Sequence, residues 1–102
     1  MKFGFYIRKV RERRLKADKS FSLRGVARQL KVEPSYLSKV ERDEVRPMSA
    51  AKIIILANIL GENADELLTR ADKIPPDLEK IIFAKPKLFA SVLRQIKDLP
   101  DE

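Results

Sequence analysis

The stretch from Ser22 to Glu41 constrains the fold of this chain most strongly, because it encodes two short helices joined by a tight turn. Ser22 is a good N-cap, since its hydroxyl can accept a hydrogen bond from a free N–H of the first helical turn. Pro34 suits the first position of the second helix, because its φ is already helical and its missing N–H is not needed there. Apolar residues repeat at helical spacing in both halves: Leu23, Val26, Ala27 and Leu30, then Tyr36, Leu37 and Val40. The stretch therefore predicts two helices that each bury one side.

This segment resembles the helix-turn-helix of the Cro/repressor family, which is also called the XRE or lambda-repressor-like family. The residues that carry the resemblance are Ala27, Val32 and the run from Pro34 to Glu41. Ala27 is small at the point where the two helices cross closely. The resemblance implies an all-α fold with a five-helix core, whose second motif helix lies in the DNA major groove.

Two residues depart from the family pattern. Lys31 stands in the turn, where the family usually has glycine at a positive φ, and a side chain there costs about 1 kcal/mol. Gly25 stands inside the first motif helix, where it is expected to cost about 1 kcal/mol relative to alanine. Neither departure breaks the pattern.

Basic residues are concentrated in the first half of the chain. The net charge of the whole chain is +7. Residues 1–52 carry 15 Lys and Arg against 6 Asp and Glu, whereas residues 53–102 carry 7 against 9. A basic surplus favours an anionic partner, nucleic acid first and an acidic membrane surface second. Because the basic half also holds the motif, double-stranded DNA is the favoured partner.

Composition excludes several classes of function. The chain has no cysteine and no histidine, which removes disulfides, thiol chemistry, histidine bases and the common zinc sites. We therefore expect no enzyme activity, no catalytic residue, no cofactor and no metal ion. The apolar run of residues 53–56 is too short to span a bilayer, and residues 1–16 lack the apolar core of a signal peptide. The expected location is the cytoplasm, with no membrane partner.

Further helices are predicted on both sides of the motif. Helical spacing of apolar residues covers Phe3 to about Lys16, Ala50 to Leu60, and a segment from the Asn63 cap to about Ala71. Pro75 and Pro76 then prevent a continuous helix. The predicted fold class is all-α, with a five-helix lambda-repressor-like DNA-binding domain in residues 1–72. A C-terminal extension of two short helices is expected in residues 73–102.

The resemblance also assigns residues to DNA contacts. Residues at the N-terminal end and outer side of the second motif helix reach base edges. Mapped onto this chain, those are Pro34, Ser35, Ser38 and Lys39. Residues assigned to backbone phosphates, which position a protein without reading sequence, are Ser22, Arg24, Tyr36, Arg42 and Arg46. Tyr36 is equally compatible with a core role, and Leu23 stands where the family often has a glutamine that contacts DNA.

Arg11 and Glu41 are expected to form a structural salt bridge. In the family, an arginine of the first helix commonly pairs with the glutamate that closes the recognition helix, and these residues hold the two positions here. The pair would tie the first helix to the third. A DNA contact by Arg11 is the alternative.

The C-terminal extension carries an apolar face that lies outside the five-helix core of the family. Its residues are Leu78, Ile81, Ile82, Leu88, Phe89, Val92 and Leu93. Two short amphipathic helices rarely stand alone, so this face must be buried on the core, on a second subunit or on a different protein. We expect it to form or reinforce a dimer.

These features predict a sequence-specific transcriptional regulator, a repressor that binds a palindromic operator as a homodimer. The alternative is the antitoxin of a toxin–antitoxin pair, which would repress its own operon and hold a toxin protein through the C-terminal helices. A third interpretation, a helix-turn-helix used only for protein contact, is disfavoured by the basic first half.

Overall fold

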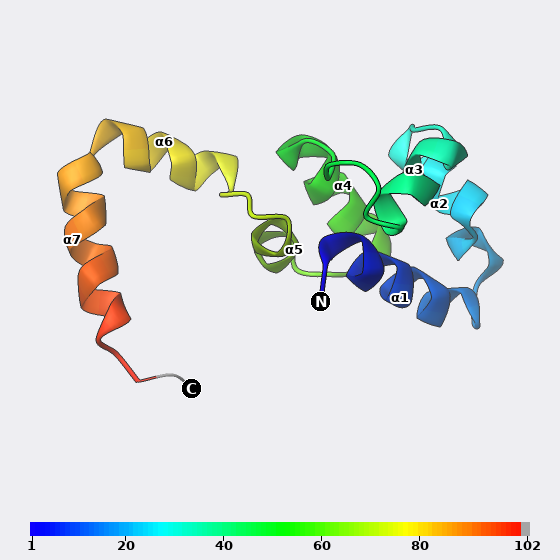
Figure 1. The fold of residues 1–102 in the computed structure, drawn as a ribbon, viewed down its shortest axis with the longest axis horizontal. Coiled ribbons are helices and arrows are strands. Elements are labelled where there is room, and N and C mark those ends of the chain that lie inside the picture. The colour runs from blue at the N-terminus through cyan, green and yellow to red at the C-terminus, as the bar shows by residue number, and fades with distance from the viewer. Residues whose placement is uncertain (101–102) are drawn as a thin grey trace.

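The protein is described by a computed structural model, which describes residues 1–100 and shows helices and no strand in that range. The helices are α1 (Phe3–Leu15), the short 3₁₀ helix η1 (Lys19–Phe21), α2 (Leu23–Leu30), α3 (Pro34–Glu41), α4 (Ala50–Leu60), α5 (Ala64–Arg70), α6 (Pro76–Ala84) and α7 (Pro86–Lys97). Helices α1 to α5 cluster together, while α6 and α7 project from the α5 side (Figure 1). The all-α fold, with five α-helices followed by two more in the extension, is confirmed.

One hydrophobic core is formed by the five α-helices α1 to α5. Each of them contributes side chains that are almost fully buried: Ile7, Val26, Leu30, Leu37, Ile53, Leu56, Leu67 and Leu68. These residues belong to the apolar stripes that helical spacing predicts. Met48 is also buried, although it lies in the loop before α4 where no periodicity points to it.

The starts of α2 and α5 follow the predicted caps, since Ser22 and Asn63 each accept a hydrogen bond from a backbone N–H of the helix that follows. Ser49 caps α4 in the same way. Lys31 has the left-handed conformation expected of the turn, with φ of 61°. Lys52 adds a contact that sequence reasoning did not find, since its Nζ donates to the backbone oxygen of Leu30 at 2.7 Å. That bond satisfies a carbonyl at the end of α2 and joins α4 to the motif.

Gly25 corrects an expectation. Helix propensity makes it a cost, but a Cβ at this position would lie 2.2 Å from the backbone oxygen of Ser20. Gly4 in α1 is similar, because its Cβ would lie 2.0 Å from the backbone oxygen of Val40. Glycine is needed at both places so that a helix can approach a neighbouring backbone closely.

The C-terminal extension stands away from the core. Helix α6 leads outward from the α5 side, and α7 runs across its direction from its far end (Figure 1). Neither helix has a buried side chain. The radius of gyration is 16.0 Å, against about 13 Å for a compact domain of this length. Within the described residues, no helix is both long and apolar enough to cross a membrane.

Candidate nucleic-acid interface

Helix α3 presents a polar outer stripe. Its inner side is fixed in the core by Leu37 and Val40, and Glu41 is buried beside them. The opposite side holds four polar residues at positions i, i+3, i+4 and i+7, which share one face of a helix. This outer stripe consists of Ser35, Ser38, Lys39 and Arg42. Ser35, Lys39 and Arg42 are exposed and Ser38 is half-buried, so the stripe offers hydroxyl, ammonium and guanidinium donors to solvent.

The structure places the remaining predicted contacts around this stripe in different environments. Pro34 is half-buried at the first position of α3. Arg24 is exposed on α2, and Arg46 is exposed in the loop between α3 and α4. The ring of Tyr36 packs against the hydrophobic core, which supports its core role, and its phosphate contact stays a prediction.

Ser22 already has a structural partner. Its Oγ accepts a hydrogen bond from the backbone nitrogen of Gly25 at 3.0 Å. A hydroxyl has one donor in addition to its acceptor sites, so Ser22 can cap α2 and still donate to a phosphate. Leu23 next to it is half-buried and packs against the core.

Arg42 carries a partner that sequence reasoning missed. Its Nε lies 2.7 Å from Oε2 of Glu44, and both side chains are about half exposed. An exposed ion pair of this kind contributes little to stability. It does neutralise one of the cations assigned to phosphate contact. The signal in the sequence was that Glu44 follows Arg42 by two residues, just after the end of α3.

Arg8 is a cation to which the sequence analysis assigned no role. A shallow cleft forms where α1, α2 and α3 meet, and its lining includes Arg8, Leu23, Ser38 and Arg42. Arg8 also lies 3.3 Å from Glu12 in an exposed i, i+4 pair on α1. The cleft brings Arg8 and Arg42 together at the end of the outer stripe.

Arg11 and Glu41 form a buried ion pair that holds α1 against α3. The Nε of Arg11 lies 2.6 Å from Oε2 of Glu41, and its Nη2 donates to Oε1 at 2.9 Å. Its Nη1 also donates to the backbone oxygen of Phe21 at 3.2 Å, which ties η1 to the same pair. The hydrogen bonds with Glu41 raise the pKa of Arg11. This two-pronged geometry fixes the orientation of α3 relative to α1.

The turn after α3 closes onto the start of α1. Asp43 has a positive φ of 58°, and its carboxylate accepts hydrogen bonds from the backbone nitrogens of Gly4 at 2.8 Å and Phe5 at 3.3 Å. Lys2 precedes α1 and makes no side-chain cap. The absence of a capping residue before Phe3 was the signal in the sequence that a cap from elsewhere was needed.

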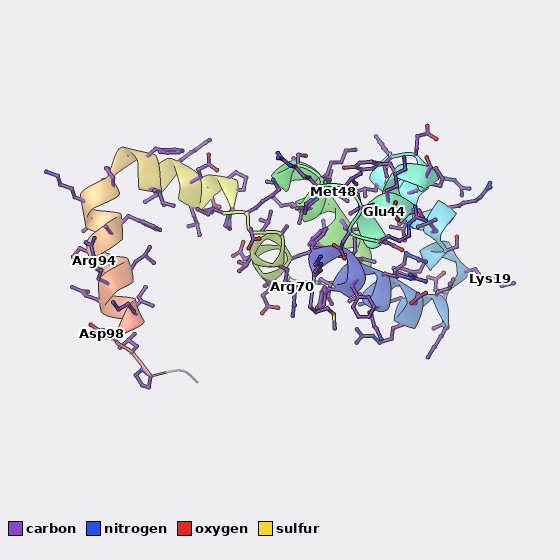
Figure 2. All side chains as sticks on the ribbon, in the orientation of Figure 1. Lys19, Glu44, Met48, Arg70, Arg94 and Asp98 are labelled. Carbon is purple, nitrogen blue, oxygen red and sulfur yellow. The ribbon has the colours of Figure 1, made fainter. Side chains whose placement is uncertain are left out.

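Polar contacts also join α1 to α5 and to the turn before it. The hydroxyl of Tyr6 donates to Oε1 of Glu62, and this bond is the main reason why the pKa of Tyr6 is raised. The guanidinium of Arg70 lies 3.8 Å from the centre of the Tyr6 ring, in the range of a cation–π contact. Arg70 lies on the side of the five-helix cluster that faces the extension, whereas Lys19 lies on the opposite side (Figure 2).

Comparison with known proteins gives one family and one kind of relative. Residues 2–69 match the model of a helix-turn-helix domain. The chain is 32% identical over 62 residues to the HTH-type transcriptional regulator RamB of Mycobacterium tuberculosis, in strains CDC 1551 and H37Rv. That match covers 61% of this chain but only 13% of the relatives. No solved structure matches the chain significantly.

Proposed function

The chain belongs to the helix-turn-helix domain family, and on that premise we propose that it is a cytoplasmic DNA-binding transcriptional regulator. The outer stripe of α3 carries this proposal. Its polar residues face outward while the opposite side of the same helix is buried. The stripe can therefore enter a major groove without a change in the packing of α3 on the core. The name of the similar mycobacterial regulator supports the same function.

Each residue of the interface has a proposed role. Pro34, Ser35, Ser38 and Lys39 contact base edges, with Lys39 donating to O6 and N7 of a guanine. Residues that contact the DNA backbone are Ser22, Arg24, Tyr36, Arg42 and Arg46. Arg11 acts indirectly, because it positions α3 through Glu41 and is almost fully buried. The proposed function requires no catalytic residue and no cofactor.

A homodimer on a palindromic operator is the proposed binding mode, and repression is the proposed outcome. Two recognition helices one DNA turn apart would multiply the affinity of a single domain and would require a two-fold symmetric site. In this proposal residues 1–72 bind DNA and residues 73–102 associate. The exposed apolar side chains of α6 and α7 support that division.

A second candidate function is supported by those same side chains. An antitoxin would bind its operator through α3 and hold a toxin protein on the apolar face of the extension. This candidate differs from the first in the occupant of the face, and an adjacent gene for a short toxin-like protein would favour it.

A duplex titration tests the main proposal. A fluorescent random-sequence duplex and a selected duplex are titrated with the protein at several salt concentrations. With about six phosphate contacts, log K should fall with log salt at a slope of roughly −5. Lys39→Ala should weaken the selected duplex, whereas Lys87→Ala, which removes the same charge from α7, should change little. Absence of duplex binding at low salt would overturn the proposal.

A further inference from the structure

Helix α4 has two apolar faces. One face packs in the core through Ile53, Leu56, Ala57 and Leu60. The opposite face repeats at i, i+3, i+4 and i+7 and contains no charged residue. This outer face of α4 consists of Ala51, Ile54, Ile55 and Asn58. Ile54 and Ile55 are 37% and 44% exposed, whereas a surface helix normally turns charged and polar residues outward.

Helix α7 has one apolar face, and most of that face is exposed among the described residues. The apolar face of α7 consists of Leu88, Phe89, Val92, Leu93 and Ile96. Its members other than Phe89 are 43 to 59% exposed. The opposite face is polar and includes Ser91, Arg94 and Asp98, the last two labelled in Figure 2. The division between the two faces is typical of a helix that packs against another apolar surface.

The accessible surface area of the chain exceeds that of a compact monomer of the same mass. The accessible surface is 7657 Å², about 1,700 Å² more than expected for a compact monomer of 11.8 kDa. Obligate homodimers bury about 1,000–2,500 Å² on each subunit. The surplus is therefore the size that a stable dimer of this chain would remove from water.

We propose that two copies of this chain exchange their C-terminal extensions, so that the apolar face of α7 in each copy packs on the outer face of α4 in the other. This proposal rests on the homodimer of the proposed function and names the surface that the extension binds. In this arrangement the apolar face of α7 from one copy covers the outer face of α4 from the other copy. This contact occurs twice, and the two contacts are related by a two-fold axis that closes the assembly.

The path of the extension favours exchange over packing within one chain. Helix α6 begins at Pro76, directly after Pro75 in a stiff double-proline step, and its nine residues span about 13 Å. Ile82 and Phe83 of α6 line an open groove together with Ala50 at the start of α4, but α6 buries no side chain on the core. Helix α7, at the far end of α6, therefore lies away from its own α4 (Figure 1).

Exchange also removes both the apolar face of α7 and the outer face of α4 from water. A pairing of α7 with α7 of the second copy would cover the extension but leave Ile54 and Ile55 in water. The outer stripe of α3 has no residue in either apolar face, so the exchanged dimer keeps its DNA surface free.

Complementation between two variants tests the exchange. Ile55→Lys places a charge on the outer face of α4, and Leu93→Lys places one on the apolar face of α7. Ser91→Lys adds the same charge to the polar face of α7 and is the matched control. All three positions are exposed, so circular dichroism should show unchanged helix content and melting. Sedimentation velocity over a concentration series then gives the dimer dissociation constant of each chain.

We expect Ile55→Lys and Leu93→Lys each to raise the dissociation constant at least about tenfold, a loss of the size that a charge forced into an apolar interface produces. Ser91→Lys should dimerise like the unmodified chain. An equimolar mixture of the two impaired chains should recover part of the dimer, because the intact α7 of one can pack on the intact α4 of the other.

Three results would overturn the exchange. They are a wild-type chain that stays monomeric, an Ile55→Lys chain that dimerises as well as wild type, and a mixture that associates no better than its components. DNA binding is measured separately on a duplex with one half-site, which needs only one domain. Binding there with a failed complementation rejects the exchange alone, whereas no binding there rejects the proposed function.

Discussion

The carboxylate of Asp43 lies 2.8 Å from the backbone nitrogen of Gly4, across 39 positions of sequence. This contact supplies the N-cap that α1 does not have in its own preceding residue. It also fixes the turn that follows α3 against the start of α1. Helix α3 is therefore held at its end by α1, through Asp43 and through the ion pair of Arg11 with Glu41.

Asp43→Ala should lower the free energy of unfolding by about 1–2 kcal/mol, the usual cost of a lost N-cap with an added cost for alanine at positive φ. Urea unfolding followed by circular dichroism measures it. Asp72→Ala is the matched control, because Asp72 also has a positive φ, of 57°, and measures the backbone cost alone. Equal losses in the two variants would show that the cap to Gly4 contributes nothing.

Gly25→Ala should destabilise the protein, although alanine is the better helix former. The added Cβ meets the backbone oxygen of Ser20 at 2.2 Å, so η1 must move away from α2. We expect a loss of about 1–3 kcal/mol, the range for overpacking a tight contact, against a gain of at most about 1 kcal/mol in propensity. Arg24→Ala, one residue earlier on the exposed side of α2, is the control for propensity. A Gly25→Ala chain that is more stable than wild type would contradict the close approach.

Gly25 shows where sequence reasoning reaches its limit. The stripe of Val26, Ala27 and Leu30 repeats within one helix, so local periodicity predicted which side of α2 is buried. The steric need at Gly25 comes from the loop that precedes the helix, and spacing alone does not report how closely two backbones pass. The sequence therefore assigned a cost to a residue that the packing requires.

The same difference between local pattern and long-range contact explains which parts of the site were predicted and which contacts were missed. The outer stripe of α3 could be predicted because Pro34 marks the start of the helix and its apolar residues mark the inner side. The cap from Asp43 and the bond from Lys52 to Leu30 join residues 39 and 22 positions apart. Arg11 with Glu41 spans a similar distance, and it was expected only through the family resemblance.

Arg11→Ala should be among the most damaging single changes outside the apolar core. Removing one partner of a buried pair leaves the other charge uncompensated, which costs about 3–5 kcal/mol. Arg8→Ala is the matched control on the same helix, because its pair with Glu12 is exposed and should be worth about 0.5 kcal/mol or less. The double change Arg11→Met with Glu41→Leu should recover part of the loss. Thermal unfolding of the four chains decides whether charge compensation is the cause.

Tyr6→Phe should lower stability at neutral pH by about 1 kcal/mol, because it removes a hydrogen bond to the charged Glu62 while keeping the ring against Arg70. The hydrogen bond raises the pKa of Tyr6 above its ordinary 10.0, so folding favours the protonated phenol. Its contribution is complete below pH 10 and is lost as the pH rises through the raised value. Urea unfolding at pH 8 and pH 11 should show the wild-type advantage shrinking. An advantage that is constant over this range would contradict the assignment.

The last prediction concerns the division of labour along α3. Lys39→Ala should cost about 1–3 kcal/mol on the preferred duplex and relax selectivity at one base position, because it would remove the proposed base contact. Arg42→Ala should weaken all duplexes about equally, because a phosphate contact carries no sequence information. Glu44→Gln should act in the opposite direction, since it releases Arg42 from the ion pair at 2.7 Å and removes a negative charge beside the DNA.

Competition binding measures all three changes against specific and random DNA. Glu44→Gln should raise affinity for random DNA as much as for the preferred duplex and so leave the specificity ratio unchanged, whereas Lys39→Ala should lower that ratio. Glu79→Gln, which removes a negative charge from an exposed position on α6, is the matched control for a change in net charge alone. If Glu44→Gln and Glu79→Gln raise affinity equally, the effect is one of overall charge, and Arg42 has no special place at the phosphate backbone.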